Sequence, residues 1–265
     1  MKETELMFEI LDRIMNLDIG QRGVDKLYGP ARARSTEPLC AAAARRLSGT
    51  RVGDCIVLIT GSLTRPWVSM NIGETDGPVG VAALARALSY GFNAIPVVVT
   101  DTSLIEPISE TLRASGQAIA SLAEAKRATS NKRFCSVAVV LGFPLEDIEA
   151  RKEAQRIISE FRPTAVIAVE RAGMTPKGTY HNMLGQDYSE GRARIDYLVE
   201  KPRPPEFQRS GWAMEAMRSG WELSRKPSIS TFPMVRFCVR NCRQTFYCLL
   251  VYRTGGVMRS RLRSQ

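Results

Sequence analysis

Short apolar runs alternate with amphipathic segments along the first three quarters of the chain. Four runs are rich in β-branched residues and predict strands buried on both faces of a sheet, at residues 55–60, 94–100, 134–141 and 164–169. The other segments have apolar residues at helical spacing and predict helices, at residues 6–15, 36–47, 79–90, 104–115 and 145–161. This alternation is typical of βαβ units, so we predict an α/β fold of three layers, with a mostly parallel sheet between helices on both faces.

Polar residues and glycines at the ends of these segments predict where two of the helices begin and end. The helix at 36–47 has Ser35 or Thr36 as its entry, because short hydroxyl side chains are good N-caps. The helix that follows the first strand has Asp76 as its expected N-cap and Gly91 as its expected stop.

The alternation ends near Leu198, and the composition changes at the same place. Residues 199–265 hold 13 Lys and Arg against 4 Asp and Glu, so +9 of the net charge of +10 lies there. We therefore predict an α/β domain at 1–198 and a basic tail containing Arg, Pro and Cys at 199–265, with disorder of the tail as an open alternative. No aromatic-interleaved sheet motif accompanies the charges, so we expect no nucleic-acid partner.

Membrane association is not expected either. No apolar run approaches the roughly 18–20 residues that span a bilayer. The first residues have mixed charge, unlike a signal peptide or an Arg-rich transit peptide. The sequence contains no signal for a particular oligomeric state.

Acidic residues follow several of the predicted strands. Glu74, Asp76, Asp101 and Glu170 lie in loops or just past strand ends, which a parallel sheet brings to one edge. Converging carboxylates need a cation, and oxygen ligands favour Mg²⁺ or Mn²⁺, so the first three are predicted metal ligands. The alternative is that Asp76 and Asp101 cap helices and that Glu170 pairs with Arg171.

Glycines surround the start of the helix at 79–90. Gly73, Gly77 and Gly80 can offer backbone N–H groups to a carboxylate or phosphate, and Ser62 and Arg65 on the preceding loop can assist them. The pattern is neither GxGxxG nor a Walker A sequence, so no nucleotide cofactor is expected. The alternative is that these glycines only permit a tight turn.

Three separated motifs carry a resemblance to a known family, and they occur in its order: Ile59-Thr-Gly61, Glu74-Thr-Asp-Gly-Pro-Val-Gly80 and Val169-Glu-Arg-Ala-Gly173. Over residues 1–198 the chain resembles the C-terminal domain of the D-glutamate cyclase family. The resemblance implies a hydro-lyase that converts D-glutamate to 5-oxo-D-proline and water. In animals it also implies the mitochondrial matrix, with the targeting segment lying upstream of this chain.

The resemblance also implies roles for individual residues. Glu170 is the expected base, Arg171 or a bound Mg²⁺ or Mn²⁺ polarises the γ-carboxylate, and Thr75 with Gly77 and Gly80 holds the α-carboxylate. The expected partner is therefore an amino acid or another small carboxylate.

The C-terminal part departs from the family pattern. The family domain continues with a second glycine-rich acidic motif, which residues 199–265 do not contain. An alternative C-terminus, from alternative splicing or a shifted reading frame, is the simplest account. We therefore expect an incomplete sheet and a weak or inactive enzyme. Two other functions remain open: a metal-dependent phosphohydrolase that uses the same acidic edge, and a non-catalytic fragment or interaction module.

Overall fold

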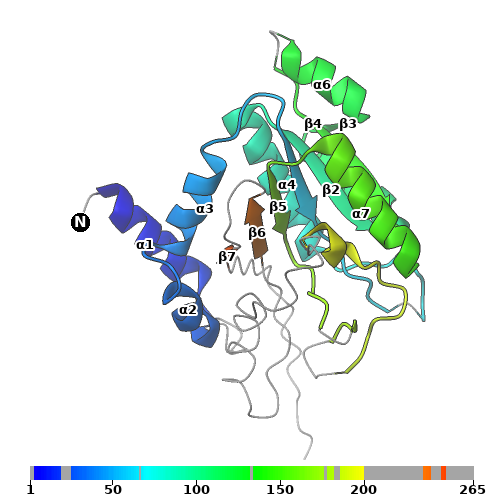
Figure 1. The fold of residues 1–265 in the computed structure, drawn as a ribbon, viewed down its shortest axis with the longest axis horizontal. Helices are drawn as coiled ribbons and strands as arrows, with labels where there is room; N and C mark the ends of the chain where they lie inside the picture. The colour runs from blue at the N-terminus through cyan, green and yellow to red at the C-terminus, as the bar shows by residue number, and fades with distance from the viewer. Residues whose placement is uncertain are drawn as a thin grey trace, which may run out of the picture.

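A parallel sheet forms the centre of the computed structural model (Figure 1). The structure describes residues 3–18, 25–65, 67–131, 134–175, 178–181, 186–199, 235–239 and 246–248. Five strands run parallel in the order β3-β4-β2-β1-β5, and two short strands, β6 and β7, continue the sheet antiparallel beyond β5. Their bounds are β1 Cys55–Ile59, β2 Ile95–Asp101, β3 Ala118–Ile119, β4 Val137–Phe143, β5 Ala165–Ala168, β6 Val235–Val239 and β7 Phe246–Cys248.

Helices precede the sheet and alternate with its strands. The α-helices in the described part are α1 Glu3–Met15, α2 Asp25–Arg32, α3 Leu39–Leu47, α4 Asp76–Phe92, α5 Ile105–Ala114, α6 Leu122–Ser130 and α7 Asp147–Phe161. Two short 3₁₀ helices are η1 Thr102–Leu104 and η2 Ile195–Leu198. No helix among the described residues is long and apolar enough to cross a membrane.

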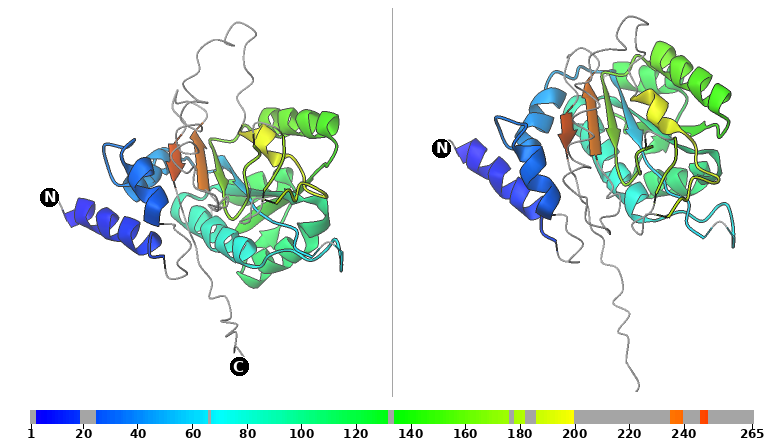
Figure 2. Two further views of the ribbon diagram at one scale, coloured as in Figure 1. Left: turned by 90° about the horizontal axis from the view of Figure 1, so that it is seen from below. Right: turned by 60° about the horizontal axis from the view of Figure 1, so that its bottom comes forward.

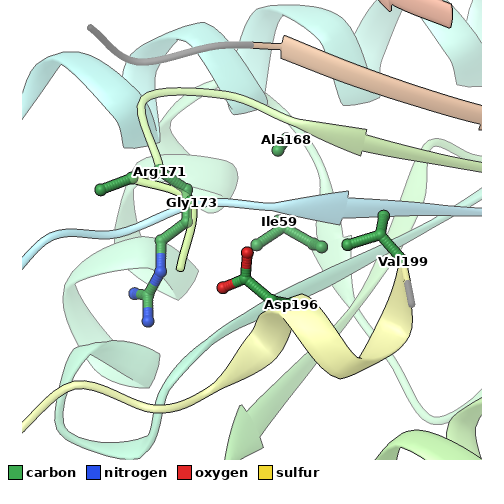
Figure 3. A pocket seen from close by; sticks show the side chains of 7 residues that line it. Ile59, Ala168, Arg171, Gly173, Asp196 and Val199 are labelled. Carbon is green, nitrogen blue, oxygen red and sulfur yellow. The ribbon is translucent and has the colours of Figure 1, made fainter. Parts of the chain in front are cut away.

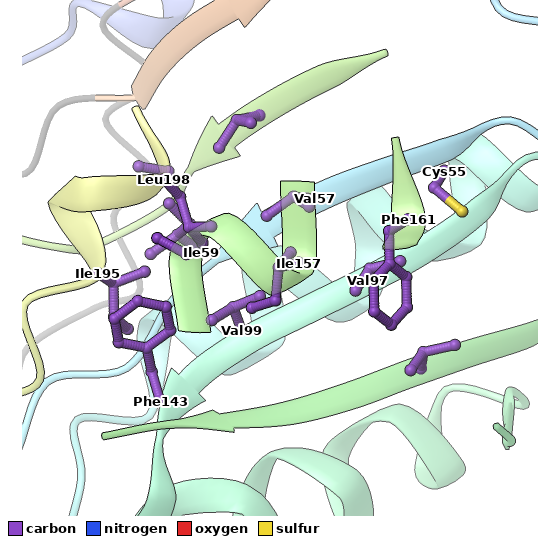
Figure 4. Close-up of a cluster of buried hydrophobic side chains, with 14 of the residues drawn as sticks. Cys55, Val57, Ile59, Val97, Val99, Phe143, Ile157, Phe161, Ile195 and Leu198 are labelled. Carbon is purple, nitrogen blue, oxygen red and sulfur yellow. The ribbon is translucent and has the colours of Figure 1, made fainter. Parts of the chain in front are cut away.

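The side chains of the central strands alternate between two hydrophobic cores. Ile56 and Leu58 of β1 face the core that α3, α4 and α5 cover, whereas Val57 and Ile59 face the core that α6, α7 and η2 cover. Figure 2 shows α4 and α7 on opposite sides of the sheet, and Figure 4 shows the second core. All five residues of β1 are buried. The predicted three-layer α/β fold is therefore confirmed.

Helix α3 begins later than the sequence predicted. Its N-cap residue is Pro38 rather than Ser35 or Thr36, and Pro38 makes no side-chain capping bond. Asp12 of α1 supplies the cap from outside the helix, because its carboxylate accepts hydrogen bonds from the N–H groups of Leu39 at 2.7 Å and Cys40 at 2.8 Å. A polar residue from another helix thus sets where α3 starts.

Helix α4 differs from its prediction at both ends. Its N-cap residue is Thr75, and Asp76 is the first helical residue. Gly91 lies inside the helix, which ends at Asn93 in the left-handed conformation with a φ of 49°. Asn tolerates this conformation better than most residues because its short side chain bonds to nearby backbone.

The predicted basic tail lies mostly outside the described residues. Within 199–265 the structure describes only Val199, β6 and β7. Strand β6 pairs antiparallel with β5, and β7 pairs antiparallel with β6. The boundary near residue 198 and the proposed disorder of the tail remain predictions.

The Asp12 cap yields a test of how α1 is held on the domain. The Asp12 side chain is 1% exposed and also accepts a hydrogen bond from the Tyr28 hydroxyl at 2.9 Å. Asp12→Ala should lower the free energy of unfolding by about 2–3 kcal/mol, because it leaves buried donors without acceptors. Urea unfolding measures the change.

Glu9→Ala is the matched control on the same helix. Glu9 forms a half-exposed ion pair with Arg32 at 3.1 Å, so its loss should cost only about 0–1 kcal/mol. Equal losses in the two variants would show that Asp12 does not anchor α1.

Candidate functional site

A buried ion pair lies at the C-terminal edge of the sheet. Asp101 is the last residue of β2, and Arg171 follows β5 on the other side of β1. The guanidinium contacts both carboxylate oxygens, with Nη2 donating to Oδ1 at 3.1 Å. The side chains are 1% and 5% exposed, respectively. The pair therefore bridges the ends of β2 and β5 across the end of β1.

The same two side chains also bind backbone from two loops. Arg171 donates to the carbonyl oxygens of Gly61 at 2.8 Å and Ala193 at 2.6 Å, and Asp101 accepts the N–H of Ala193 at 2.6 Å. Burial by itself disfavours the charged guanidinium, but the attraction of Asp101 outweighs it and raises the pKa of Arg171. The alternative predicted for Arg171, a salt bridge with Glu170, is replaced by this pair with Asp101.

The predicted metal ligands do not gather into one group. Among the described residues, no three His, Cys, Asp or Glu side chains form a cluster that holds a metal ion. Asp101 directs both oxygens to Arg171 and Ala193, while Glu74 lies in the loop before α4 and Asp76 is the first residue of that helix. These residues do not fit a shared Mg²⁺ or Mn²⁺ site, so we derive no step that uses a metal.

A second buried hydrogen-bonded pair, Tyr180 and Asp196, holds chain segments that follow β5. The Tyr180 hydroxyl donates to Asp196 at 2.7 Å, and Asp196 also accepts the N–H of Met174 at 3.0 Å. Burial and the charge of Asp196 raise the pKa of Tyr180. Figure 3 shows Arg171 and Asp196 beside a cavity of about 10 Å³. This volume holds one water molecule at most, so it is not a substrate site.

Glu170 has a strained backbone at the end of β5. Its φ is 49°, in the left-handed region that most residues avoid. Two other non-glycine residues with positive φ, Asn93 and Arg162, occupy ordinary helix C-caps. Glu170 has no such explanation, and neither does Arg65. Such strain persists where the surrounding structure imposes it, and it is common at active sites.

Two of the glycines predicted to bind an anion lie in close packing contacts, and their anion-binding role stays a prediction. A Cβ atom on Gly77 would lie 2.6 Å from Thr60 Oγ1 and 3.1 Å from Glu170 Cβ, and one on Gly80 would lie 3.2 Å from Val169. Gly77 is buried, and its N–H donates to the side chain of Asp76 at 3.0 Å. The first turn of α4 is thereby brought against the ends of β1 and β5.

The loop before α4 contains the remaining predicted residues. The N–H of Glu74 donates to the Ser62 carbonyl at 2.9 Å, so these two residues lie side by side at the base of the loop. Thr75 is exposed at the N-terminus of α4. Arg65 is exposed and lies further out, where its carbonyl accepts the N–H of Val68 at 2.8 Å. Ser62 and Glu74 are therefore neighbours in space, whereas Arg65 is not part of this pair.

One residue at this site was missed by the sequence reasoning. Arg192 is partly buried and donates from Nη1 to Ser62 Oγ at 3.2 Å. It lies next to Ala193, which the Asp101–Arg171 pair holds. No motif marked Arg192, because it is 130 residues from Ser62 in the chain and lies among other arginines.

Comparison with known proteins gives a family assignment. The family model described as "D-glutamate cyclase-like, C-terminal" matches residues 11–209, which is most of the chain. The match confirms the resemblance inferred from the three motifs. No match was found among curated proteins or among solved structures.

Breaking the central ion pair should destabilise the protein strongly. Asp101→Asn should lower the free energy of unfolding by about 3–5 kcal/mol, because the charge of Arg171 stays buried without its partner. Glu110→Gln is the control, since Glu110 pairs with Arg113 on the exposed face of α5 and its substitution should cost about 0–1 kcal/mol. If urea unfolding shows similar losses of unfolding free energy in the two variants, the Asp101 pair contributes no more to stability than a surface pair.

The close approach of α4 to the sheet can be tested within one helix. Gly77→Ala should destabilise by about 1–3 kcal/mol, because the added methyl group meets Thr60 and Glu170. Gly91→Ala is the control: nothing lies within 4 Å of a Cβ there, so it should be neutral or stabilising by about 0.5–1 kcal/mol. Thermal unfolding compares the two. A harmless Gly77→Ala substitution would contradict the packing described here.

Proposed function

The chain belongs to the D-glutamate cyclase-like family of C-terminal domains, and we propose that it acts on D-glutamate, giving 5-oxo-D-proline and water. In this reaction the α-nitrogen forms a bond to the γ-carboxyl carbon, and one γ-oxygen leaves as water. The two protons of that water are supplied by the ammonium group. The enzyme must therefore accept and return protons, and it must make a carboxylate open to attack.

Glu170 is the proposed base, and its strained backbone is the observation that carries the proposal. The residue is partly exposed at the C-terminal edge of the sheet, where α/β proteins bind their ligands. Its Cβ packs close to the first turn of α4, and the buried Arg171 follows it directly in the chain. A carboxylate held in this way keeps a fixed position relative to a substrate, which proton transfer requires.

The start of α4 offers a place for a substrate carboxylate. Thr75 is exposed there and makes no side-chain capping bond, and the helix N-terminus carries partial positive charge. Ser62 lies close by through its contact with Glu74. We assign Thr75 to the α-carboxylate. We propose that Gly77 and Gly80 support this position through their close packing, and that Arg171 positions Glu170, which precedes it in the chain.

Two further parts of the proposal concern the protein as a whole. The location in the mitochondrial matrix in animals follows from the family resemblance, and low turnover by this chain follows from the absence of the family's second glycine-rich acidic motif. Neither is needed for the role of Glu170.

The activity test compares wild-type protein with a variant that lacks the base. The protein is incubated with D-glutamate, and 5-oxoproline is measured by liquid chromatography. Glu170→Gln should reduce the rate by about 100-fold or more, because a positioned base contributes at least this factor. Glu160→Gln should have no effect, since Glu160 lies on the surface of α7 in a pair with Arg156.

Two results would contradict the proposal. One is a rate of 5-oxoproline formation no higher than in protein-free buffer after long incubation. The other is a rate for Glu170→Gln equal to that of wild type, which would exclude Glu170 as the base.

A further inference from the structure

We propose that Arg192 binds one carboxylate of a small dicarboxylate ligand, an inference that rests on the proposed function for the identity of that ligand. The residue comes from the segment that crosses the C-terminal edge of the sheet between Tyr188 and Ala193. Its role would be to recognise the ligand, whereas Glu170 would act on it.

The guanidinium of Arg192 is held in one orientation by neutral groups. Nε donates to the carbonyl of Tyr188 at 2.7 Å, Nη1 to the hydroxyl of Ser62 at 3.2 Å, and Nη2 to the carbonyl of Leu63 at 2.6 Å. Its central carbon also lies 3.8 Å from the centre of the Tyr188 ring, in a cation–π contact. The side chain is therefore preorganised before any ligand arrives.

The charge of Arg192 is not neutralised by an ion pair within the described part of the chain. Two other buried or partly buried arginines have carboxylate partners, since Arg171 pairs with Asp101 and Arg32 pairs with Glu9. Arg86 resembles Arg192 in donating to neutral oxygens, those of Ser115 and Tyr90. Burial lowers the pKa of Arg192 and the nearby charge of Arg171 acts in the same direction, while Tyr188, Asp101 and Glu74 oppose the shift without cancelling it. A cation in this situation is stabilised by an incoming anion.

The hydrogen bonds of Arg192 leave room for a carboxylate. A guanidinium has five N–H groups, and three of those of Arg192 are used. One N–H remains on each terminal nitrogen, which matches the two oxygens of a carboxylate. The residue is partly exposed to solvent.

The position of Arg192 relative to the rest of the site favours a dicarboxylate. Arg192 binds Ser62, which bonds through its carbonyl to Glu74, the residue before Thr75 at the start of α4. A ligand carboxylate on Arg192 therefore lies on the same loop as the proposed α-carboxylate position at Thr75. The Arg192 guanidinium and the partly positive N-terminus of α4 each suit one carboxylate, so together they suit a ligand with two.

The test uses glutarate, a dicarboxylate that has no amine and cannot cyclise to a lactam. Isothermal titration of glutarate into the full chain should give an affinity that weakens roughly 10- to 100-fold in Arg192→Gln, as expected for the loss of a charge-assisted hydrogen-bonded contact. Arg194→Gln is the matched control, because Arg194 is two residues away and pairs with Asp147 at 2.7 Å. It should bind glutarate as wild type does.

A purely structural role for Arg192 makes a different prediction. If Arg192 only ties the loops together, Arg192→Gln lowers the melting temperature without changing the affinity for glutarate, and the proposal is wrong. If Arg192→Gln does not fold, Arg192→Lys decides, because lysine keeps the charge but not the two-pronged geometry. Unchanged glutarate affinity in a folded Arg192→Lys variant would also overturn the proposal.

Failure of this inference can be told apart from failure of the proposed reaction. Glutarate binding that depends on Arg192, without 5-oxoproline formation from D-glutamate, would support the carboxylate site and reject the reaction. If the protein converts D-glutamate but its affinity for glutarate is the same in wild type and in Arg192→Gln, the reaction is supported and the site is rejected. Absence of glutarate binding to the wild-type protein would reject the site.

Discussion

Four segments that are far apart in the chain meet at the Asp101–Arg171 ion pair. Asp101 ends β2, Arg171 follows β5, and together they bind backbone groups of Gly61 and Ala193. A buried pair of this kind adds little net stability compared with apolar packing, but removal of one partner is costly. Its main effect is to fix where the loops at the C-terminal edge of the sheet can lie.

This constraint sets the positions of two of the residues to which we assign a role in the reaction. Glu170 directly precedes Arg171, and Arg192 directly precedes Ala193. Because the ion pair holds Arg171 and Ala193 in place, it also fixes the backbone of their neighbours, the proposed base Glu170 and the proposed carboxylate-binding residue Arg192. Asp101, predicted as a metal ligand, and Arg171, predicted to polarise the substrate, pair with each other. The partly exposed residues next to this pair, Glu170 and Arg192, are the ones that we propose to contact a ligand.

The sequence predicted the sheet well because its central strands are buried on both faces and read as unbroken apolar runs, as in β1. It predicted helix ends less well, because the start of α3 depends on Asp12 from another helix. Helix α6 was missed although Ser121 and Glu124 form a capping box that the sequence displays. The pairing of Asp101 with Arg171 and the role of Arg192 have no local signal, since both depend on contacts across 70 or more residues.

The most direct test of the account is a crystal structure of the Glu170→Gln variant with D-glutamate bound. We expect density at the C-terminal edge of the sheet, with the substrate amine facing residue 170 and one carboxylate within hydrogen-bond distance of the Arg192 guanidinium. Density for D-glutamate at another surface, with this edge empty and the Asp101–Arg171 pair unchanged, would contradict it.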